Sequence, residues 1–375
     1  MKLRIPVLLA VAAFAASCLL GSAQSFAQNA YITNAHSNNV SVISISTDTV
    51  IATVSVGINL FGVAVTPDGS KVYVGNAGSD SVSVISTASN TVVGNPIAVG
   101  SNPVGLAITP DGSKIYVGNY NDGTVSVIAT ATDTVIATIS TGLAPVGVVA
   151  TPDGSKIYVA NAVSDTVSVI ATATNTVIAT ISGITNPFGV TATPDNSQVY
   201  VGDYFHGTVA RIATATNTVL GSPIAVGSNP QGVAVTPDGG KVYVVNADGT
   251  VSVIATATNT VIATIRVGAI PFGAAVSPDG SKVYVANESE NDVSVIATNS
   301  NTVTATIPVG RGPVAFGMFI QPAPKFAGTP GKADCYGQSV AALVLKYRGL
   351  SAAAAGLGFA SVPALQTTIL NFCGG

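Results

Sequence analysis

Short runs of apolar and β-branched residues alternate with polar turn residues along most of the chain. The stretch from 61 to 99 holds four of them: FGVAVT (61–66), KVYVGN (71–76), SVSVIS (81–86) and TVVGNPIAV (91–99). Val, Ile, Thr and Tyr dominate these runs, and such side chains pack well on a pleated surface. The pattern predicts four short strands joined by tight turns, which we call strands A, B, C and D.

This group of four strands recurs, and two independent markers give its period. One marker is the tyrosine of strand B, which stands at Tyr31, Tyr73, Tyr116, Tyr158, Tyr200, Tyr243 and Tyr284. The other is an Asp or Asn between strands C and D, at Asp48, Asn90, Asp133, Asn175, Asn217, Asn259 and Asn301. Seven repeats of about 42 residues indicate units that stack against one another.

The turn residues have local physical roles. The segment Pro67-Asp68-Gly69 predicts a type I turn followed by glycine in the left-handed region, which makes a tight hairpin between strands A and B. The Asp or Asn between strands C and D suits a left-handed turn position. We therefore interpret these polar residues as turn formers and not as metal ligands.

Seven four-stranded units predict an all-β fold, a seven-bladed β-propeller of four-stranded antiparallel blades over residues 28–322. The first unit begins on strand B, while residues 313–322 match strand A. The C-terminal segment is therefore expected to supply the inner strand of blade one, with Phe316–Ile320 pairing with Ala30–Asn34. This interlock would protect two open sheet edges.

The TPDGSK-VYV-N phrase, the VSVI run and the V-G-x-x-P turn resemble the YVTN-type β-propeller repeat family. The resemblance covers residues 30–322. It implies a propeller like those of bacterial exported proteins and surface-layer proteins. The repeat motif of that family is structural, so the resemblance assigns no catalytic residue to any position.

Residues 1–27 have the pattern of an export signal. Lys2 and Arg4 precede an apolar stretch over residues 5–20, and small residues lead to a cleavage site after Ala27. Such a signal directs the chain to the periplasm, the cell surface or the medium. Three alternatives stay open at this point: cleavage after Ala23, a retained anchor helix, and lipidation of Cys18.

Composition and charge exclude several classes of protein. The chain has 375 residues, of which 47% are hydrophobic and 8% are charged. No long apolar run follows residue 20, so no transmembrane segment is expected after cleavage. Cleavage removes two of the 14 basic residues and leaves 12 against 17 acidic ones, a net charge of −5. This balance gives no basic footprint for a nucleic acid.

The C-terminal part departs from the repeat. Residues 323–333 are a Pro/Gly linker, and residues 334–375 are expected to form a helical tail closed by a disulfide between Cys335 and Cys373. A unit of this size needs a staple or a docking surface to be stable. Its two candidate roles are a lid packed on the propeller and a module that docks a partner or the cell envelope.

Three short helices are expected within the tail. Apolar residues at helical spacing mark the first, over residues 340–347. Ser351 and Ser361 have the character of N-caps for helices over 352–358 and 362–372.

Ligands of propellers usually lie at one mouth of the channel, between the B–C and D–A loops. An Asn or Asp opens each B–C loop and is expected to satisfy loop backbone groups; these residues are Asn34, Asn76, Asn119, Asn161, Asp203, Asn246 and Asn287. The residues that break the repeat are the binding candidates: His36, Tyr120, Asp122, Tyr204, Phe205, His206, Glu288, Glu290 and Arg311. The two histidines belong to blades nearly opposite each other, so we predict no shared metal and no cofactor.

The far end of each blade carries a lysine after the A–B turn, which we interpret as a solvated face of mixed charge. These lysines are Lys71, Lys114, Lys156, Lys241 and Lys282. An anionic partner on that face is the competing interpretation.

Three functional hypotheses follow from the sequence. The first is an exported, non-catalytic binding or scaffold propeller whose mouth contacts a protein or a cell-envelope component, with a small-molecule ligand also open. The second is a lactonase-like or other periplasmic enzyme, with Arg311, Glu288, His36 and His206 as acid–base and anion-binding candidates. The third is a structural surface-layer component.

Overall fold

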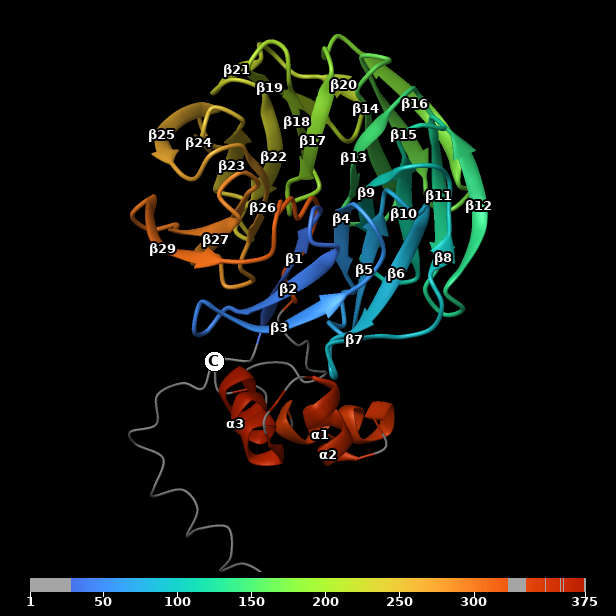
Figure 1. The fold of residues 1–375 in the computed structure, drawn as a ribbon, viewed down its shortest axis with the longest axis vertical. Helices are drawn as coiled ribbons and strands as arrows, with labels where there is room; N and C mark the ends of the chain where they lie inside the picture. Colours follow the sequence, from blue (N-terminus) through green and yellow to red (C-terminus); the bar gives the residue numbers. More distant parts are fainter. Residues whose placement is uncertain (1–27, 323–334, 348, 358, 360, 374–375) are drawn as a thin grey trace, which may run out of the picture. The chain divides into compact units, whose positions relative to one another are not determined.

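The computed structural model describes residues 28–322, 335–347, 349–357, 359 and 361–373 (Figure 1). The first range forms a β-propeller and the others form a helical unit, and each is described by itself. The predicted signal at 1–27 and linker at 323–333 lie outside the described residues. Within those residues no helix is long and apolar enough to cross a membrane.

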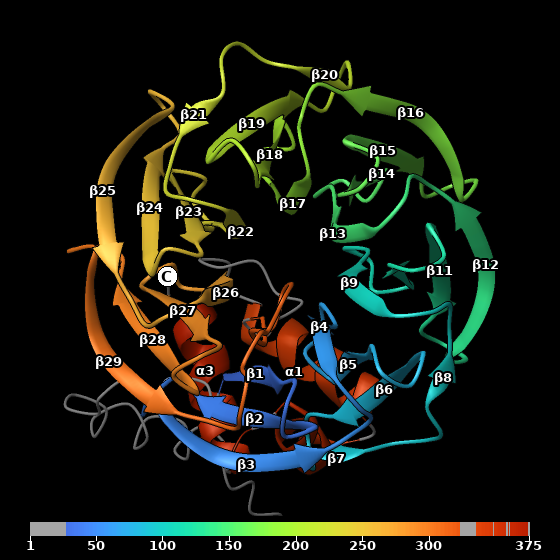
Figure 2. The ribbon, with the colours of Figure 1, turned by 45° about the horizontal axis from the view of Figure 1, so that its top comes forward.

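Seven antiparallel sheets surround a common axis, which confirms the predicted seven-bladed propeller (Figure 2). Blade one contains β1 (Asn29–Asn34), β2 (Asn39–Ser44) and β3 (Thr49–Ser55). Blade two contains β4 (Leu60–Val65), β5 (Lys71–Asn76), β6 (Ser81–Ser86), β7 (Thr91–Val92) and β8 (Ile97–Ala98). Blade three contains β9 (Pro103–Ile108), β10 (Lys114–Asn119), β11 (Thr124–Ala129) and β12 (Thr134–Ser140). Blade four contains β13 (Pro145–Ala150), β14 (Lys156–Asn161), β15 (Thr166–Ala171) and β16 (Thr176–Ser182). Blade five contains β17 (Pro187–Ala192), β18 (Gln198–Asp203), β19 (Thr208–Ala213), β20 (Thr218–Val219) and β21 (Ile224–Ala225). Blade six contains β22 (Pro230–Val235), β23 (Lys241–Asn246), β24 (Thr250–Ala255) and β25 (Thr260–Arg266). Blade seven contains β26 (Pro271–Val276), β27 (Lys282–Asn287), β28 (Asp292–Ala297) and β29 (Thr302–Pro308).

The core lies between blades. One cluster joins Tyr73 and Val84 of blade two to Ile115 and Val117 of blade three, and equivalent clusters join the other blades. Strands B and C are almost wholly buried, whereas strand D presents alternate residues to solvent. Apolar residues on both faces of B and C are therefore a consequence of blade stacking.

The outer strand is interrupted in two blades. We expected one D strand over 91–99, but the structure has β7 and β8, which pair separately with β6. Gly94 adopts φ 71° between them, and Pro96 lacks an N–H for the ladder. The equivalent break in blade five separates β20 from β21.

Residues 313–321 lie along β1 and close the ring. Ala30 bridges Ile320 and Asn34 bridges Pro313, both in antiparallel orientation. Between these points Phe316 forms a parallel bridge with Gly62 of blade two, and its carbonyl accepts from Val63 N at 3.0 Å. The segment thus departs from a continuous strand, because its middle bonds to the next blade.

Each strand-B tyrosine is buried and donates from its hydroxyl to the C–D turn of the next blade. Six of these Oη–Oδ1 distances lie between 2.6 and 3.1 Å. The pairs are Tyr31–Asn90, Tyr73–Asp133, Tyr116–Asn175, Tyr158–Asn217, Tyr200–Asn259, Tyr243–Asn301 and Tyr284–Asp48. The turn residues have φ near 50°, as expected, but they also form a closed circle of contacts between blades.

The lysines after the A–B turns take part in the same contacts. Lys71 Nζ lies 2.7 Å from Asp133, and Lys282 Nζ lies 2.6 Å from Asp48. In the other three, Nζ donates to a threonine carbonyl of the next blade. These lysines are partly exposed, as a solvated face of mixed charge requires, but each also reaches across a blade interface.

Ionisation of the tyrosine circle should limit stability at alkaline pH. Burial, with a smaller effect of Asp153, raises the pKa of Tyr158 to about 12 from 10.0. The hydroxyl contact of Tyr158 is then fully stabilising below pH 10 and is lost as the pH rises toward 12, since only the unfolded chain ionises in that window. We expect Tyr158→Phe to lower the free energy of unfolding by about 1 kcal/mol at neutral pH. Urea unfolding should show this difference shrinking between pH 10 and pH 12; a constant difference would contradict the assignment.

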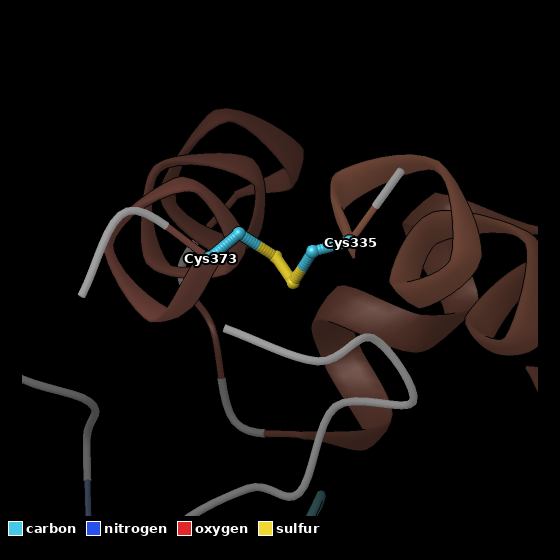
Figure 3. Close-up of a disulfide and its surroundings, with 2 residues drawn as sticks. All are labelled: Cys335 and Cys373. Carbon is cyan, nitrogen blue, oxygen red and sulfur yellow. A yellow bond between two sulfur atoms is a disulfide. The ribbon is translucent and has the colours of Figure 1, made fainter. Parts of the chain in front are cut away.

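The helical unit contains α1 (Cys335–Tyr347), α2 (Leu350–Gly356) and α3 (Val362–Cys373). Cys335 and Cys373 form the expected disulfide, with Cα atoms 5.6 Å apart, and it links α1 to α3 (Figure 3). Ser361 Oγ accepts from Ala364 N at 3.3 Å, which confirms this N-cap. Ser351 is not a cap, because α2 already begins at Leu350.

Opening the disulfide should unfold the helical unit and leave the propeller intact. The bridge closes a loop of 38 residues, a constraint worth about 4 kcal/mol in a chain-entropy estimate. We expect Cys335→Ser with Cys373→Ser to remove slow hydrogen exchange from α1 and α3, with protection of β1 to β29 unchanged. Retained protection of both helices would show that the bridge is dispensable.

Candidate functional site

The B–C loops and the D–A loops lie at one end of the propeller, which we call the mouth face. At this end six blades carry a buried asparagine on strand B whose amide donates to a strand-C serine at 2.8 to 3.0 Å. The pairs are Asn34–Ser41, Asn76–Ser83, Asn119–Ser126, Asn161–Ser168, Asn246–Ser252 and Asn287–Ser294. We expected bonds to loop backbone groups, and Asn76 does accept from Gly57 N at 3.2 Å. The principal contact shared by the six is nevertheless a clamp between two strands.

Blade five lacks this clamp. Asp203 replaces the asparagine and Ala210 replaces the serine. The Asp203 carboxylate instead contacts His206 Nδ1 at 3.0 Å and accepts from Thr185 N at 3.1 Å. The carboxylate is nearly buried, whereas the imidazole is 63% exposed. The substitutions are therefore accompanied by an outward-facing histidine, His206, on the β18–β19 loop.

Four phenylalanine rings meet around the axis beneath the mouth face. Phe61, Phe188 and Phe272 come from inner strands β4, β17 and β26, and Phe316 comes from the closing segment. Their ring centroids are 5.5 to 5.8 Å apart in four pairs, three of which are edge-to-face contacts with Phe272. Val104, Val146 and Val314 join the same cluster. Apolar side chains from separate blades thus meet in one cluster, a feature that we did not predict.

Large apolar side chains also stand exposed on the loops of the mouth face. They are Phe205 (66% exposed), Leu143 (60%), Val163 (59%), Ile58 (57%) and Ile270 (44%). Tyr204 connects Phe205 to the axial cluster, since the Tyr204 ring lies 5.6 Å from that of Phe188 and 5.7 Å from that of Phe205. Sequence reasoning found Phe205 but missed the others. Ile58, Leu143 and Ile270 lie in D–A loops, and Val163 lies in the β14–β15 loop. The available signal was that Ile58 and Leu143 stand where other blades carry Ser101 or Ser228.

The structure brings two of the predicted site residues together. His36 N donates to the carbonyl of Arg311 at 3.0 Å, and both side chains are exposed. Glu288 and Glu290 lie on the β27–β28 loop of the adjacent blade. His206 lies on the β18–β19 loop, on the other side of the axis from β1 and β2 (Figure 2).

Tyr120 and Asp122 have structural contacts on the mouth face. The Tyr120 ring packs against the axial cluster. Asp122 Oδ2 accepts from Ser101 N at 2.7 Å and so fixes the loop before β9. These contacts make the loops of blade three a rigid part of the surface.

No group of three or more His, Cys, Asp or Glu suited to a metal ion occurs within the described parts of the chain. The mouth-face candidates stand in separate loops around an apolar centre, with exposed aromatic, aliphatic and charged groups. Aromatic anchors beside polar groups are typical of protein-binding surfaces.

Comparison with known proteins supports the fold and leaves the activity open. Residues 92–201 match the family model described as YNCE-like beta-propeller, and residues 25–136 match that of Lactonase, 7-bladed beta-propeller. A search of curated proteins found no match to this chain.

The solved structures that are similar to this chain include the following two. One is titled Kuenenia stuttgartiensis Hydrazine Synthase, with 26% identity, a TM-score of 0.66, and coverage of 72% of this chain and 92% of that chain. The other is a functionally unknown protein from Desulfotomaculum acetoxidans DSM 771, with 19% identity, a TM-score of 0.66, and coverage of 77% of this chain and 99% of that chain. The second likeness concerns the fold alone.

The axial cluster should be a major source of stability for the mouth face. Phe272→Ala removes the ring that contacts Phe61, Phe188 and Phe316, and we expect it to lower the free energy of unfolding by about 3 kcal/mol. The control is Ile262→Ala on outer strand β25, where the side chain is 52% exposed and a loss below about 1 kcal/mol is expected. Equal losses in chemical denaturation would show that the rings do not pack as a unit.

Proposed function

We propose that this protein is an exported, non-catalytic binding or scaffold propeller that contacts a partner through its mouth face. The observation that carries the proposal is the exposed ring of Phe205, which is joined through Tyr204 to the axial phenylalanine cluster. An exposed aromatic side chain held by a second ring is a common anchor of binding surfaces. The partner is a protein or another cell-envelope component.

Three further observations support this proposal. The N-terminal sequence has the pattern of an export signal, and the disulfide of the helical unit is compatible with an oxidising compartment. The resemblance to YVTN-type repeats also supports export, since that family includes exported proteins. We accordingly place the protein in the periplasm, at the cell surface or outside the cell.

A lactonase-like activity is the second candidate, because residues 25–136 match a lactonase family model. His36 and Arg311 adjoin each other and would be its acid–base and anion-binding groups. Against it, Ala35 and Val314, which stand close to this pair in sequence, belong to the apolar axial cluster. The binding proposal therefore accounts for more of the mouth face.

The proposal predicts that the partner can be trapped at the mouth face and not on the outer strands. A photoreactive benzoylphenylalanine replaces Phe205 on the β18–β19 loop or, as the matched control, Ile178 on outer strand β16, which is 51% exposed. Illumination of the exporting cells should give one discrete adduct from position 205 and none from position 178.

Two results would contradict the proposal. The first is an equal set of adducts from both positions, or none from either. The second is turnover of a lactone by residues 28–375 that is lost in Arg311→Ala, which would assign the mouth face to an enzyme.

A further inference from the structure

We propose that the mouth face binds a cationic polypeptide segment that places an apolar side chain against Phe205. This inference rests on the proposed function and adds the chemistry of the partner. It depends on two features that coincide at this end of the propeller, an excess of carboxylates and the protruding apolar residues.

Charge is distributed unevenly between the two ends of the propeller. The mouth face and its strand ends carry Asp80, Asp122, Asp165, Asp203, Asp248, Glu288, Glu290 and Asp292. Among the described residues of the propeller only Arg266 and Arg311 oppose them there, which leaves a net charge of −6 with neutral histidines. At the other end eight aspartates face five lysines and Arg211, a net charge of −2. The mouth face therefore attracts cations more strongly than the opposite end.

The fold holds most of these carboxylates in place. Asp80, Asp165 and Asp248 each accept from the backbone N–H of a D–A loop, at 2.7 to 3.0 Å. Asp122 and Asp203 do the same for Ser101 and Thr185. Carboxylates that the fold already holds in place lose little conformational entropy when a partner binds. Their attraction for a cationic partner is therefore not offset by the cost of ordering them.

Phe205 supplies the apolar half of the recognition. Its side chain is 66% exposed while its ring is supported at 5.7 Å by Tyr204, which in turn packs on Phe188. A supported aromatic ring is a low-entropy anchor for a partner's aliphatic side chain. Leu143 and Val163 protrude on the neighbouring blade, so a segment crossing these loops meets apolar groups with carboxylates beside them.

The test measures peptide binding to residues 28–375 by fluorescence anisotropy. The probe is a labelled peptide of about 12 residues that contains Lys and Leu equally, beside matched Glu/Leu and Lys/Ser peptides. We expect the Lys/Leu peptide to bind, with affinity falling about tenfold between about 50 and 300 mM NaCl, and the other two to bind at least about tenfold more weakly.

Matched variants distinguish the effect of the mouth face on peptide affinity from the effects of net charge and of exposed apolar area elsewhere. Glu288→Gln with Glu290→Gln should weaken the Lys/Leu peptide by about threefold, and Phe205→Ser by about tenfold. Thr53→Lys with Thr180→Lys changes the net charge equally on outer strands, and Ile178→Ser removes an apolar side chain of comparable exposure. Both controls should leave the affinity unchanged.

The outcomes distinguish this inference from the proposed function. Equal binding of the Glu/Leu peptide, or equal losses in the control variants, would overturn the cationic partner. A discrete adduct at position 205 without binding of the Lys/Leu peptide would also overturn the cationic partner, but it would support the proposal that the mouth face binds a partner. Absence of both adduct and peptide binding would contradict both proposals.

Discussion

The close approach of neighbouring inner strands around the axis is the constraint on which the rest of the propeller depends. A Cβ atom on Gly105 would lie 1.9 Å from the carbonyl oxygen of Val146, and one on Gly147 would lie 2.1 Å from that of Phe188. Only glycine permits such contacts, since any side chain would separate the backbones. Gly62, Gly189 and Gly273 approach the backbone of the next inner strand in the same way. The residues directly before them, Phe61, Phe188 and Phe272, meet in the axial cluster.

Contacts between blades lock the outer part of the ring in the same repetitive way. Each buried tyrosine and its Asp or Asn partner belong to different blades, and the Tyr284–Asp48 contact joins the last blade to the first. The framework therefore constrains nearly every position of strands B and C and leaves the mouth loops to vary. Function in a protein of this kind is expected where the repeat is broken, as in blade five, where an aspartate–histidine pair replaces the asparagine–serine clamp.

The repeat markers were sufficient to predict the number of blades, the strand order and the tight turns, because these depend on local periodicity and turn chemistry. They were insufficient for contacts between blades. The Asp or Asn of the C–D turn was interpreted as a turn former, and its φ near 50° agrees, yet its side chain also binds a tyrosine about 59 residues earlier. Likewise, Ser351 has the composition of an N-cap, but α2 starts one residue before it. Such contacts depend on how units pack, which a single repeat does not encode.

For the candidate site, too, some features could be predicted from the sequence and others depend on packing. The sequence by itself determined the fold, the disulfide pairing and the set of residues that break the repeat, since each is a departure from a visible pattern or a consequence of composition. Only the tertiary structure decided which of them meet: it placed the backbone of His36 beside that of Arg311, turned His206 toward Asp203 within one loop, and joined Tyr204 to a cluster of phenylalanines from separate blades. The physical reason is that these contacts depend on loop conformation and on packing between blades, which the spacing of residues along the chain does not specify.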